Sequence, residues 1–252
     1  SKVYAGKYYT TPIRVTSKLV SAGVIVYSEK SASEILKEID GKVNYILVDS
    51  EKKIPRKLSI SGISANIERR AREIVKKSEL FFYKGNDLAL DAIDIFLTHM
   101  TKYELRGLGN KKITIIGGGN LGSKLALTLV ERGGNVFLTR RNKAKLKAIV
   151  KALNIIKPFN TNAEVKGLTN NVKASYKADI LIAANQGEKV ITENIVKNLK
   201  NNSIIFDAGR GTISDKALTL ALSRGINVYR VDINPSFEGL ISKLFFIDKV
   251  IK

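Results

Sequence analysis

Residues 112–141 read KITIIGGGNLGSKLALTLVERGGNVFLTRR, and this stretch decides how the rest of the chain is interpreted. The run 113–116 is rich in β-branched side chains, which favours a strand buried on both faces of a parallel sheet. Gly117, Gly119 and Gly122 follow in the pattern G-x-G-x-x-G, and apolar residues at helical spacing come next. A strand, a glycine turn and a helix in this order are typical of a dinucleotide-binding unit.

Each glycine of the turn has its own physical task. Gly117 permits the tight turn, Gly119 lets the backbone approach a pyrophosphate, and Gly122 allows the helix to pack closely on the strand. The amide groups at the start of the helix, at Asn120 and Leu121, would then face the anion. A merely structural turn, or another ligand, is the alternative. A second strand predicted at 135–139 favours the dinucleotide.

The end of that second strand indicates which nicotinamide cofactor is bound. Enzymes that use NAD usually place Asp or Glu about 20 residues after the first glycines, where the carboxylate accepts hydrogen bonds from ribose hydroxyls. Here the residues are Thr139, Arg140, Arg141 and Lys143. Guanidinium groups bind a ribose phosphate, which a carboxylate would repel, so the sequence predicts NADP. The alternative is an ordinary solvated helix start in a very basic protein.

Composition limits the classes of protein to consider. The chain has 252 residues, of which 44% are hydrophobic and 26% charged, as in an ordinary globular protein large enough for two small domains. It contains no cysteine and a single histidine, so we expect no disulfide, no thiol chemistry and no metal site. The apolar runs are short and interrupted by charge, so we expect no membrane span and a cytoplasmic location.

The formal net charge of +20 is large enough to attract polyanions. The basic residues are nevertheless spread along the chain, mixed with acids in segments such as 67–79, and they form no basic tail. We therefore expect no nucleic-acid partner. We attribute the charge to compositional bias or adaptation to heat, and note that it suits a small anionic substrate.

The residues before the glycine turn predict a small α/β unit. In chain order the expected elements are strand 24–27, helix 31–39, strand 45–48, loop 50–63 with at most one short strand, helix 66–78, apolar stretch 80–83 and a long helix from 86. Ser31 and Glu34 have the spacing of a capping box in the first helix. Asn86 or Asp87 would cap the long helix.

After Arg141, strands and helices continue to alternate, whereas 156–176 suggests only a weak strand and a surface loop. The expected elements are helix 142–153, strand 180–184, helix 193–199 capped by Thr192, strand 203–206, helix 214–223 begun by Ser214, strand 228–231 and helix 236–250. The fold class is therefore α/β, with a C-terminal doubly wound parallel Rossmann sheet and a smaller N-terminal α/β domain. We divide the chain into residues 1–105, for substrate binding or dimerisation, and 106–252, for NADP binding. The last helix is a candidate to return to the N-terminal domain.

Three segments carry a resemblance to a known superfamily. They are LDAIDIFL at 90–97, LALTLVERG at 125–133 and ADILIAANQGEKVITENIVKNLKNNSIIFDAGRGT at 178–212. Together they resemble the amino-acid dehydrogenase-like superfamily, which includes methylenetetrahydrofolate, methylenetetrahydromethanopterin and shikimate dehydrogenases. The resemblance, over about residues 85–210, implies a substrate cleft between the two domains.

The resemblance also implies positions for the nicotinamide half of the cofactor. The loop near the nicotinamide ribose maps to Ala184, Asn185 and Gln186, and the segment that borders the nicotinamide maps to Asp207 and Gly209. The Tyr-x-x-x-Lys arrangement of the folate enzymes and the paired serines of the shikimate enzymes are missing, so the substrate stays open.

The candidate catalytic residues are Lys84 and Asp87, because a Lys–Asp pair can bind a hydroxyl and move its proton. Helix capping explains Asp87 equally well. His99 lies well inside a helix, and we interpret it as structural. Arg210 would bind a substrate carboxylate or be surface charge.

The sequence thus predicts an NADP-dependent oxidoreductase that transfers a hydride between NADP(H) and a small anionic or pterin-type substrate. We lean to a methylene-tetrahydropterin dehydrogenase, because that oxidation needs no dedicated base. A shikimate-like alcohol oxidoreductase and a non-enzymatic NADP-binding regulator are the alternatives, and a homodimer is an open possibility.

Overall fold

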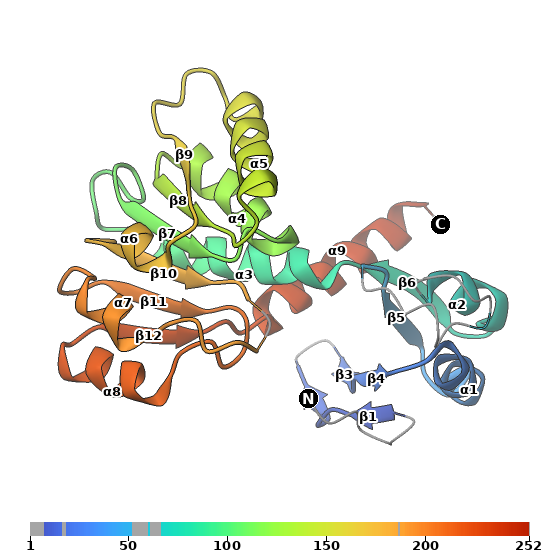
Figure 1. The fold of residues 1–252 in the computed structure, drawn as a ribbon. Coiled ribbons are helices and arrows are strands. Elements are labelled where there is room, and N and C mark those ends of the chain that lie inside the picture. Colours follow the sequence, from blue (N-terminus) through green and yellow to red (C-terminus); the bar gives the residue numbers. More distant parts are fainter. Residues whose placement is uncertain (1–7, 17–18, 52–59, 61–66, 186, 252) are drawn as a thin grey trace. The chain divides into compact units, whose positions relative to one another are not determined.

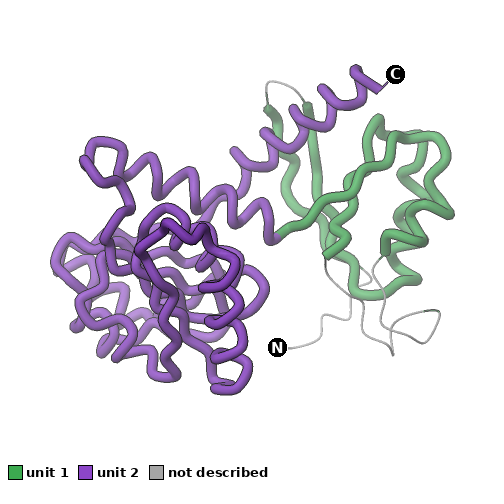
Figure 2. Tube along the Cα trace, turned by 90° about the horizontal axis from the view of Figure 1, so that it is seen from above, with its two compact units in different colours: residues 1–85 green, residues 86–252 purple. Residues whose placement is uncertain are grey.

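The chain folds into two compact units, residues 1–85 and 86–252, which Figure 2 shows in different colours. The computed structural model describes all residues except 1–7, 17–18, 52–59, 61–66, 186 and 252. Each unit is an α/β structure, as predicted. Helix α3 (Gly85–Met100), which we had assigned to the N-terminal domain, packs with the second unit because Ile93 and Leu97 are completely buried in its core. The division into functional domains stays a prediction.

The second unit contains a six-stranded sheet in which all neighbouring strands are parallel (Figure 1). Its spatial order is β12-β11-β10-β7-β8-β9. The strands are β7 (Lys112–Ile116), β8 (Asn135–Thr139), β9 (Val165–Leu168), β10 (Ile180–Ala183), β11 (Ile204–Asp207) and β12 (Asn227–Arg230). The strand order reverses between β7 and β10, so this is a doubly wound sheet with its switch point there.

Helices cover both faces of this sheet, as β10 shows residue by residue. Ile180 and Ile182 belong to the core under α3, α4 (Asn120–Glu131) and α5 (Lys143–Ile156). Leu181 and Ala183 belong to a second core under α7 (Glu193–Lys197) and α8 (Asp215–Ser223). Because successive side chains of a strand point to opposite faces, an unbroken apolar run is the pattern such a strand requires.

Two further helices complete the second unit. The first is α6 (Asn171–Ser175), with Asn170 as its N-cap, in the stretch where we expected only a weak strand and a loop. The second is α9 (Asn234–Ile251). The predicted start at Ser214 is confirmed, since its hydroxyl accepts from the amide of Ala217 at 3.3 Å. Thr192 occupies the N-cap of α7 but its side chain makes no capping hydrogen bond. No helix among the described residues is long and apolar enough to cross a membrane.

The first unit is built on two parallel strands, β5 (Tyr45–Asp49) and β6 (Glu79–Tyr83). Helices α1 (Glu29–Ile39) and α2 (Glu68–Ile74) bury a small core against them. That core consists of Leu36, Ile46, Val48, Ala71 and Val75. Four short strands form two antiparallel pairs beside it: β1 (Tyr8–Thr10) with β4 (Val24–Val26), and β2 (Arg14–Val15) with β3 (Val20–Ser21).

Three local predictions in the first 100 residues were wrong. The N-cap of α1 is Ser28, whose hydroxyl accepts from the amide of Ser31, so Ser31 lies in the first turn and makes no capping box with Glu34. Helix α3 begins at Gly85, so neither Asn86 nor Asp87 is its cap. Helix α2 ends at Ile74, not at residue 78. Its expected start at residue 66, and most of loop 50–63, lie outside the described residues.

The early end of α2 has a clear cause. The carboxylate of Asp40 accepts hydrogen bonds from the amides of Lys76, Lys77 and Ser78 at 3.0, 2.9 and 2.9 Å. These amides therefore bind a side chain from another element instead of continuing the helix. The same bonds, that of Ser78 foremost, lower the pKa of the Asp40 carboxyl.

Candidate functional site

The carboxyl ends of β7, β8, β10 and β11 lie at one edge of the parallel sheet, next to the switch point. Ligands of doubly wound sheets bind at this place, because the loops that follow the strands diverge there. Four segments form this edge: residues 117–119, 139–141, 184–188 without residue 186, and 207–212. All but one of the residues predicted to bind the cofactor fall on these segments or on the first turn of α4 or α5. The exception is Gln186, which lies outside the described residues.

The glycine turn is as tightly packed as its pattern suggested. Gly117 has φ +111°, and a Cβ there would lie 2.7 Å from Oδ1 of Asn185. A Cβ on Gly122 would overlap the carbonyl oxygen of Gly117, so any side chain would push α4 away from β7. Gly119 differs, because a Cβ there would meet nothing within 4 Å. The turn therefore has two packing glycines and one that faces open space.

The N-terminus of α4 begins at this open position. Gly119 is the N-cap, and it offers no side chain to accept hydrogen bonds from the first amides. No acidic residue lies in the first turn. The amides of Asn120, Leu121 and Gly122 are thus presented without an anionic side chain of the same turn, the arrangement that suits a bound anion.

Arg140 supports the glycine turn, a role that the sequence did not reveal. Its guanidinium donates a hydrogen bond to the carbonyl of Gly118. The amides of Gly117 and Gly118 donate to the carbonyl of Thr139 at 3.2 and 2.7 Å. The Thr139 side chain itself is buried. The end of β8 and the turn after β7 are therefore joined through backbone and side chain.

Arg141 and Lys143 are the exposed cations at the end of β8. The Arg141 side chain is 89% exposed, and its Nη2 lies 3.4 Å from the Glu188 carboxylate. Lys143 is the first residue of α5, whose first turn contains no acid. An exposed pair at 3.4 Å is weak and easily replaced, so Arg141 is accessible to another anion.

The loops after β10 and β11 pack on one another through backbone atoms. A Cβ on Gly209 would overlap the carbonyl oxygen of Asn185, and the Gly187 amide donates to the Gly209 carbonyl at 3.3 Å. Oδ1 of Asn185 is buried without a hydrogen-bond partner in the described part of the chain. A buried acceptor left unpaired is costly, so this atom suits a ligand donor.

Asp207 holds the loop that follows it. The carboxylate is 4% exposed and accepts from the Gly211 amide at 2.6 Å and from the Thr212 hydroxyl at 2.8 Å. Arg210, which precedes these two residues in the loop after β11, is exposed and has φ +62°. The Asp207 carboxylate is therefore directed into its own loop, and it positions Arg210 instead of facing outward.

Asp87 has a partner that we did not anticipate. Its Oδ1 accepts from Nζ of Lys124, on α4, at 2.5 Å. Lys124 stands two residues after Gly122, and only the packing of α3 beside α4 reveals that the two meet. Lys84 is exposed at the end of β6 in the first unit. His99 is exposed on α3, with Nζ of Lys102 3.5 Å from its ring nitrogen.

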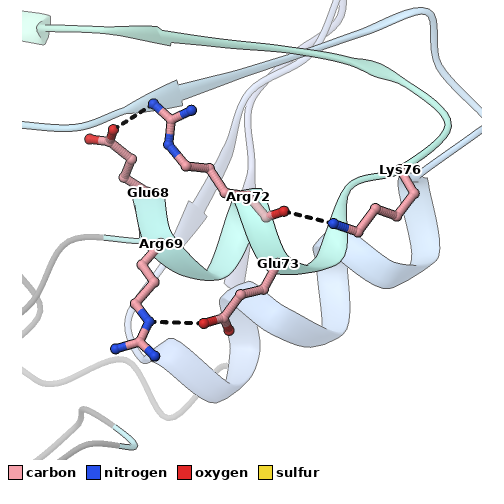
Figure 3. Close-up of a pocket in the computed structure, with 5 residues that line it drawn as sticks. All are labelled: Glu68, Arg69, Arg72, Glu73 and Lys76. Atoms are coloured by element: carbon pink, nitrogen blue, oxygen red, sulfur yellow. Dashed lines mark hydrogen bonds and ion pairs between the residues drawn. The ribbon is translucent and has the colours of Figure 1, made fainter.

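A hollow on the first unit is lined by charged residues of α2 (Figure 3). Arg69 pairs with Glu73 at 2.9 Å, and Arg72 pairs with Glu68 at 2.8 Å. The Arg72 guanidinium also lies 4.2 Å from the centre of the Phe82 ring. These charges are satisfied within the helix and its neighbours, so we place no functional site there. The described residues contain no group of three potential metal ligands.

Comparisons with known proteins agree with the geometry of the second unit. Residues 112–210 match the family model described as NADP oxidoreductase coenzyme F420-dependent. A glycerol-3-phosphate dehydrogenase (NAD(P)+) of Clostridium botulinum is 28% identical over 127 residues, covering 46% of this chain and 37% of that protein. A glutamyl-tRNA reductase of Campylobacter jejuni is 23% identical over 140 residues, covering 56% of this chain and 30% of that protein.

The chain therefore spans about a third of the length of these curated relatives. Among solved structures, the A chain of dipicolinate synthase from Bacillus subtilis has a TM-score of 0.49 and 16% identity, covering 96% of this chain and 76% of that one. Residues 112–210 therefore resemble NAD(P)-dependent oxidoreductases in sequence, and the second unit that contains them has a Rossmann-like fold.

Proposed function

We propose that the chain is an NADP-dependent oxidoreductase that transfers a hydride between NADP(H) and a small anionic substrate. The observation that carries the choice of NADP is the end of β8, where Arg141 and Lys143 are exposed and residues 139–143 include no Asp or Glu. A 2′-phosphate would replace Glu188 as the partner of Arg141. The phosphate would gain a charge-assisted hydrogen bond from the Arg141 guanidinium, and this bond is stronger than one to a ribose hydroxyl.

The glycine turn suits the rest of the dinucleotide. The space over Gly119 and the uncapped amides of α4 fit a pyrophosphate, which needs close backbone approach and several N–H donors. On the other side of the switch point, the unpaired Oδ1 of Asn185 fits an acceptor for a hydroxyl or amide of the nicotinamide half. When bound, the nicotinamide supplies the site that accepts or releases the hydride.

The chain's own groups bind and orient the substrate in this proposal. Arg210 is the candidate to bind a substrate carboxylate, and Asp207 is a positioning residue because it fixes the loop that carries Arg210. Lys84 and Asp87 stay the candidates for proton transfer. Lys124 joins them, since it holds the Asp87 carboxylate in place.

The finer assignments stay proposals. The comparisons lend no support to a methylene-tetrahydropterin substrate, towards which the sequence leaned. The Asp87–Lys124 pair favours the alternative of an alcohol oxidoreductase of the shikimate type, because such a reaction needs a proton-handling group. A non-enzymatic NADP-binding regulator would keep the same cofactor site without turnover. A cytoplasmic location and a homodimer are further proposals.

Calorimetric titration with NADPH and NADH tests the cofactor assignment, with Arg141→Ala as the diagnostic variant. We expect Arg141→Ala to weaken NADPH binding by about 1–2 kcal/mol, because one charged hydrogen-bond partner is lost, and to leave NADH binding unchanged. Lys216→Ala, an exposed lysine on α8, is the matched control and should leave both unchanged. Equal effects of Arg141→Ala on the two nucleotides would overturn the assignment to NADP.

A further inference from the structure

Helix α5 differs from the other helices of the described chain in its charge. It carries four lysines and no acidic residue over Lys143–Ile156. Helices α1 to α4 and α7 to α9 each contain at least one Asp or Glu. The acid-free stretch is longer than the helix, because no Asp or Glu occurs between Glu131 and Glu164. A compositional bias would add lysine everywhere, but it would not remove every acid from a helix of 14 residues; the other acid-free helix of the described chain, α6 (Asn171–Ser175), has only five.

The fold exposes all four of these lysines, and we call Lys143, Lys145, Lys147 and Lys151 together the α5 basic face. Lys145 lies on the other flank of the helix, since it stands two residues, or about 200°, after Lys143. Lys143, Lys147 and Lys151 follow one another at intervals of four residues, so they form a row with a rise of about 6 Å per step. The opposite side of the helix, with Leu146 and Leu153, is buried on the sheet.

The ammonium groups of this face have no ion pair within the described ranges, whereas other lysines of this unit do. Lys124, Lys189 and Lys200, for example, each pair with an aspartate. Beyond the end of α5, the Phe159 ring is 99% exposed. In Figure 1 the helix lies beside β8 and β9, at the edge strand β9 of the sheet.

We propose that the α5 basic face binds single-stranded nucleic acid through its phosphates, with Phe159 stacking on a base. Cations spread over two helical turns match a chain of phosphates better than a single phosphate group. An exposed aromatic ring that follows a basic helix in the chain, as Phe159 follows the end of α5 at Ile156, suits unpaired bases, whose faces are accessible. The proposal can be tested apart from the oxidoreductase activity, because Lys145, Lys147 and Lys151 are not part of the cofactor site, whereas Lys143 is.

Other polyanions fit less well. A membrane-binding amphipathic helix inserts its apolar face into lipid, but the apolar face of α5 is already buried in the protein core. An acidic protein would satisfy the lysines but would leave the exposed Phe159 unexplained. The sequence alone led us to expect no nucleic-acid partner because the lysines are spread along the chain, and only the helix aligns Lys143, Lys147 and Lys151 in a row.

The test is fluorescence anisotropy of a labelled oligo(dT) of about 20 nucleotides, titrated with the full chain at several salt concentrations. The diagnostic variant is Lys145→Gln, Lys147→Gln and Lys151→Gln together. Its matched control removes three exposed lysines from helices that also carry acids: Lys197→Gln, Lys216→Gln and Lys243→Gln. Both variants lose the same formal charge, so net charge cannot distinguish them.

We expect the α5 variant to bind at least about tenfold more weakly, and its plot of log K against log salt to be shallower by about 2, as for three lost phosphate contacts. The control should retain affinity within about twofold and keep the slope. Phe159→Ala should weaken binding by about fivefold or more without changing the slope, because it removes stacking and no charge.

Three results would overturn the proposal. The first is no binding of oligo(dT) by the wild type at low salt, and the second is an equal loss in the control variant. The third is full affinity of Phe159→Ala together with equal competition by polyglutamate, which would indicate a surface for acidic proteins. Thermal unfolding of the same variants shows whether they are folded, and NADPH titration then separates failure of this proposal from failure of the cofactor proposal.

Discussion

Both units contain parallel strands, but the strands are buried in different ways. In β10 every residue from Ile180 to Ala183 is buried, because helices cover both faces of the large sheet. In β5 only Ile46 and Val48 are buried, and Tyr45 is 41% exposed. The second unit is thus held mainly by two apolar cores, whereas the first has one small core and relies more on polar contacts between elements.

Asp40 and Glu29 show what these polar contacts do. Asp40 binds three amides of the segment after α2, and the buried Glu29 carboxylate accepts from the Ile60 amide at 2.6 Å. Contacts of this kind join residues more than 30 positions apart. The sequence around either residue contains no local pattern that predicts the contact. The comparison teaches that a periodic apolar pattern predicts the elements of the second unit better than those of the first.

The largest expected effect is the loss of a core side chain, and it tests this comparison directly. Leu181→Ala should cost about 2–5 kcal/mol of the free energy of unfolding of the second unit, because the side chain is fully buried. Ile46→Ala should cost the first unit about 2 kcal/mol, near the low end of the range, because its small core can relax. Urea unfolding followed by hydrogen exchange measures the free energy of unfolding of each unit separately. Equal costs in the two units would break the comparison.

The glycine turn separates a packing role from a binding role. Gly122→Ala should destabilise the second unit by about 2–3 kcal/mol and abolish nucleotide binding, since its Cβ would overlap the Gly117 carbonyl. Gly119→Ala should change stability by less than about 0.5 kcal/mol, because its Cβ meets no protein atom, yet weaken NADPH binding. Thermal unfolding and calorimetry of the two variants check this. Unchanged NADPH affinity in Gly119→Ala would contradict the proposed position of the pyrophosphate.

Arg140 and Arg141 are neighbours with different expected effects. Arg140→Ala should lower stability by about 1 kcal/mol and weaken NADPH and NADH alike, because the Gly118 carbonyl loses its donor. Arg141→Ala should leave stability unchanged, since its side chain is 89% exposed. The measurement is thermal unfolding beside the two titrations. A selective loss of NADPH affinity in Arg140→Ala would instead make Arg140 the phosphate-binding residue.

The smallest effect concerns Asp40 and the pH. Backbone hydrogen bonds, from Ser78 first, lower the pKa of its carboxyl below 3.8 in the folded state. The ionised carboxylate therefore stabilises the first unit above the unfolded pKa, and this contribution is lost as the pH falls through the folded pKa. Asp40→Ala should be less stable than the wild type at neutral pH, and the difference should shrink on acidification. Thermal unfolding over a pH series measures it, and a constant difference would show that ionisation is not involved.

The sequence predicted the fold of the second unit well because its signals are local. The apolar run of β10, the glycines after β7 and the Ser214 cap each lie within a few residues of the structure that they determine. The same holds for the cationic end of β8. The structure that these residues predict does not depend on the positions of residues far along the chain.

The sequence failed where a partner lies far along the chain. The Asp87–Lys124 pair, the Arg140–Gly118 hydrogen bond and the amides on Asp40 connect residues separated by 22 to 38 positions. No spacing rule links such residues before the fold is known. The exposed row on α5 was missed for a related reason, because lysines that look dispersed in the sequence share one side of a helix.

The most direct test of the central claim is calorimetric titration of the wild-type chain with NADPH and, separately, with NADH. We expect both to bind, with NADPH the tighter by about tenfold, the gain from one charge-assisted contact to the 2′-phosphate at the end of β8. If neither nucleotide binds, the glycine turn is a structural element only, and the assignment of this edge of the sheet as a cofactor site is wrong.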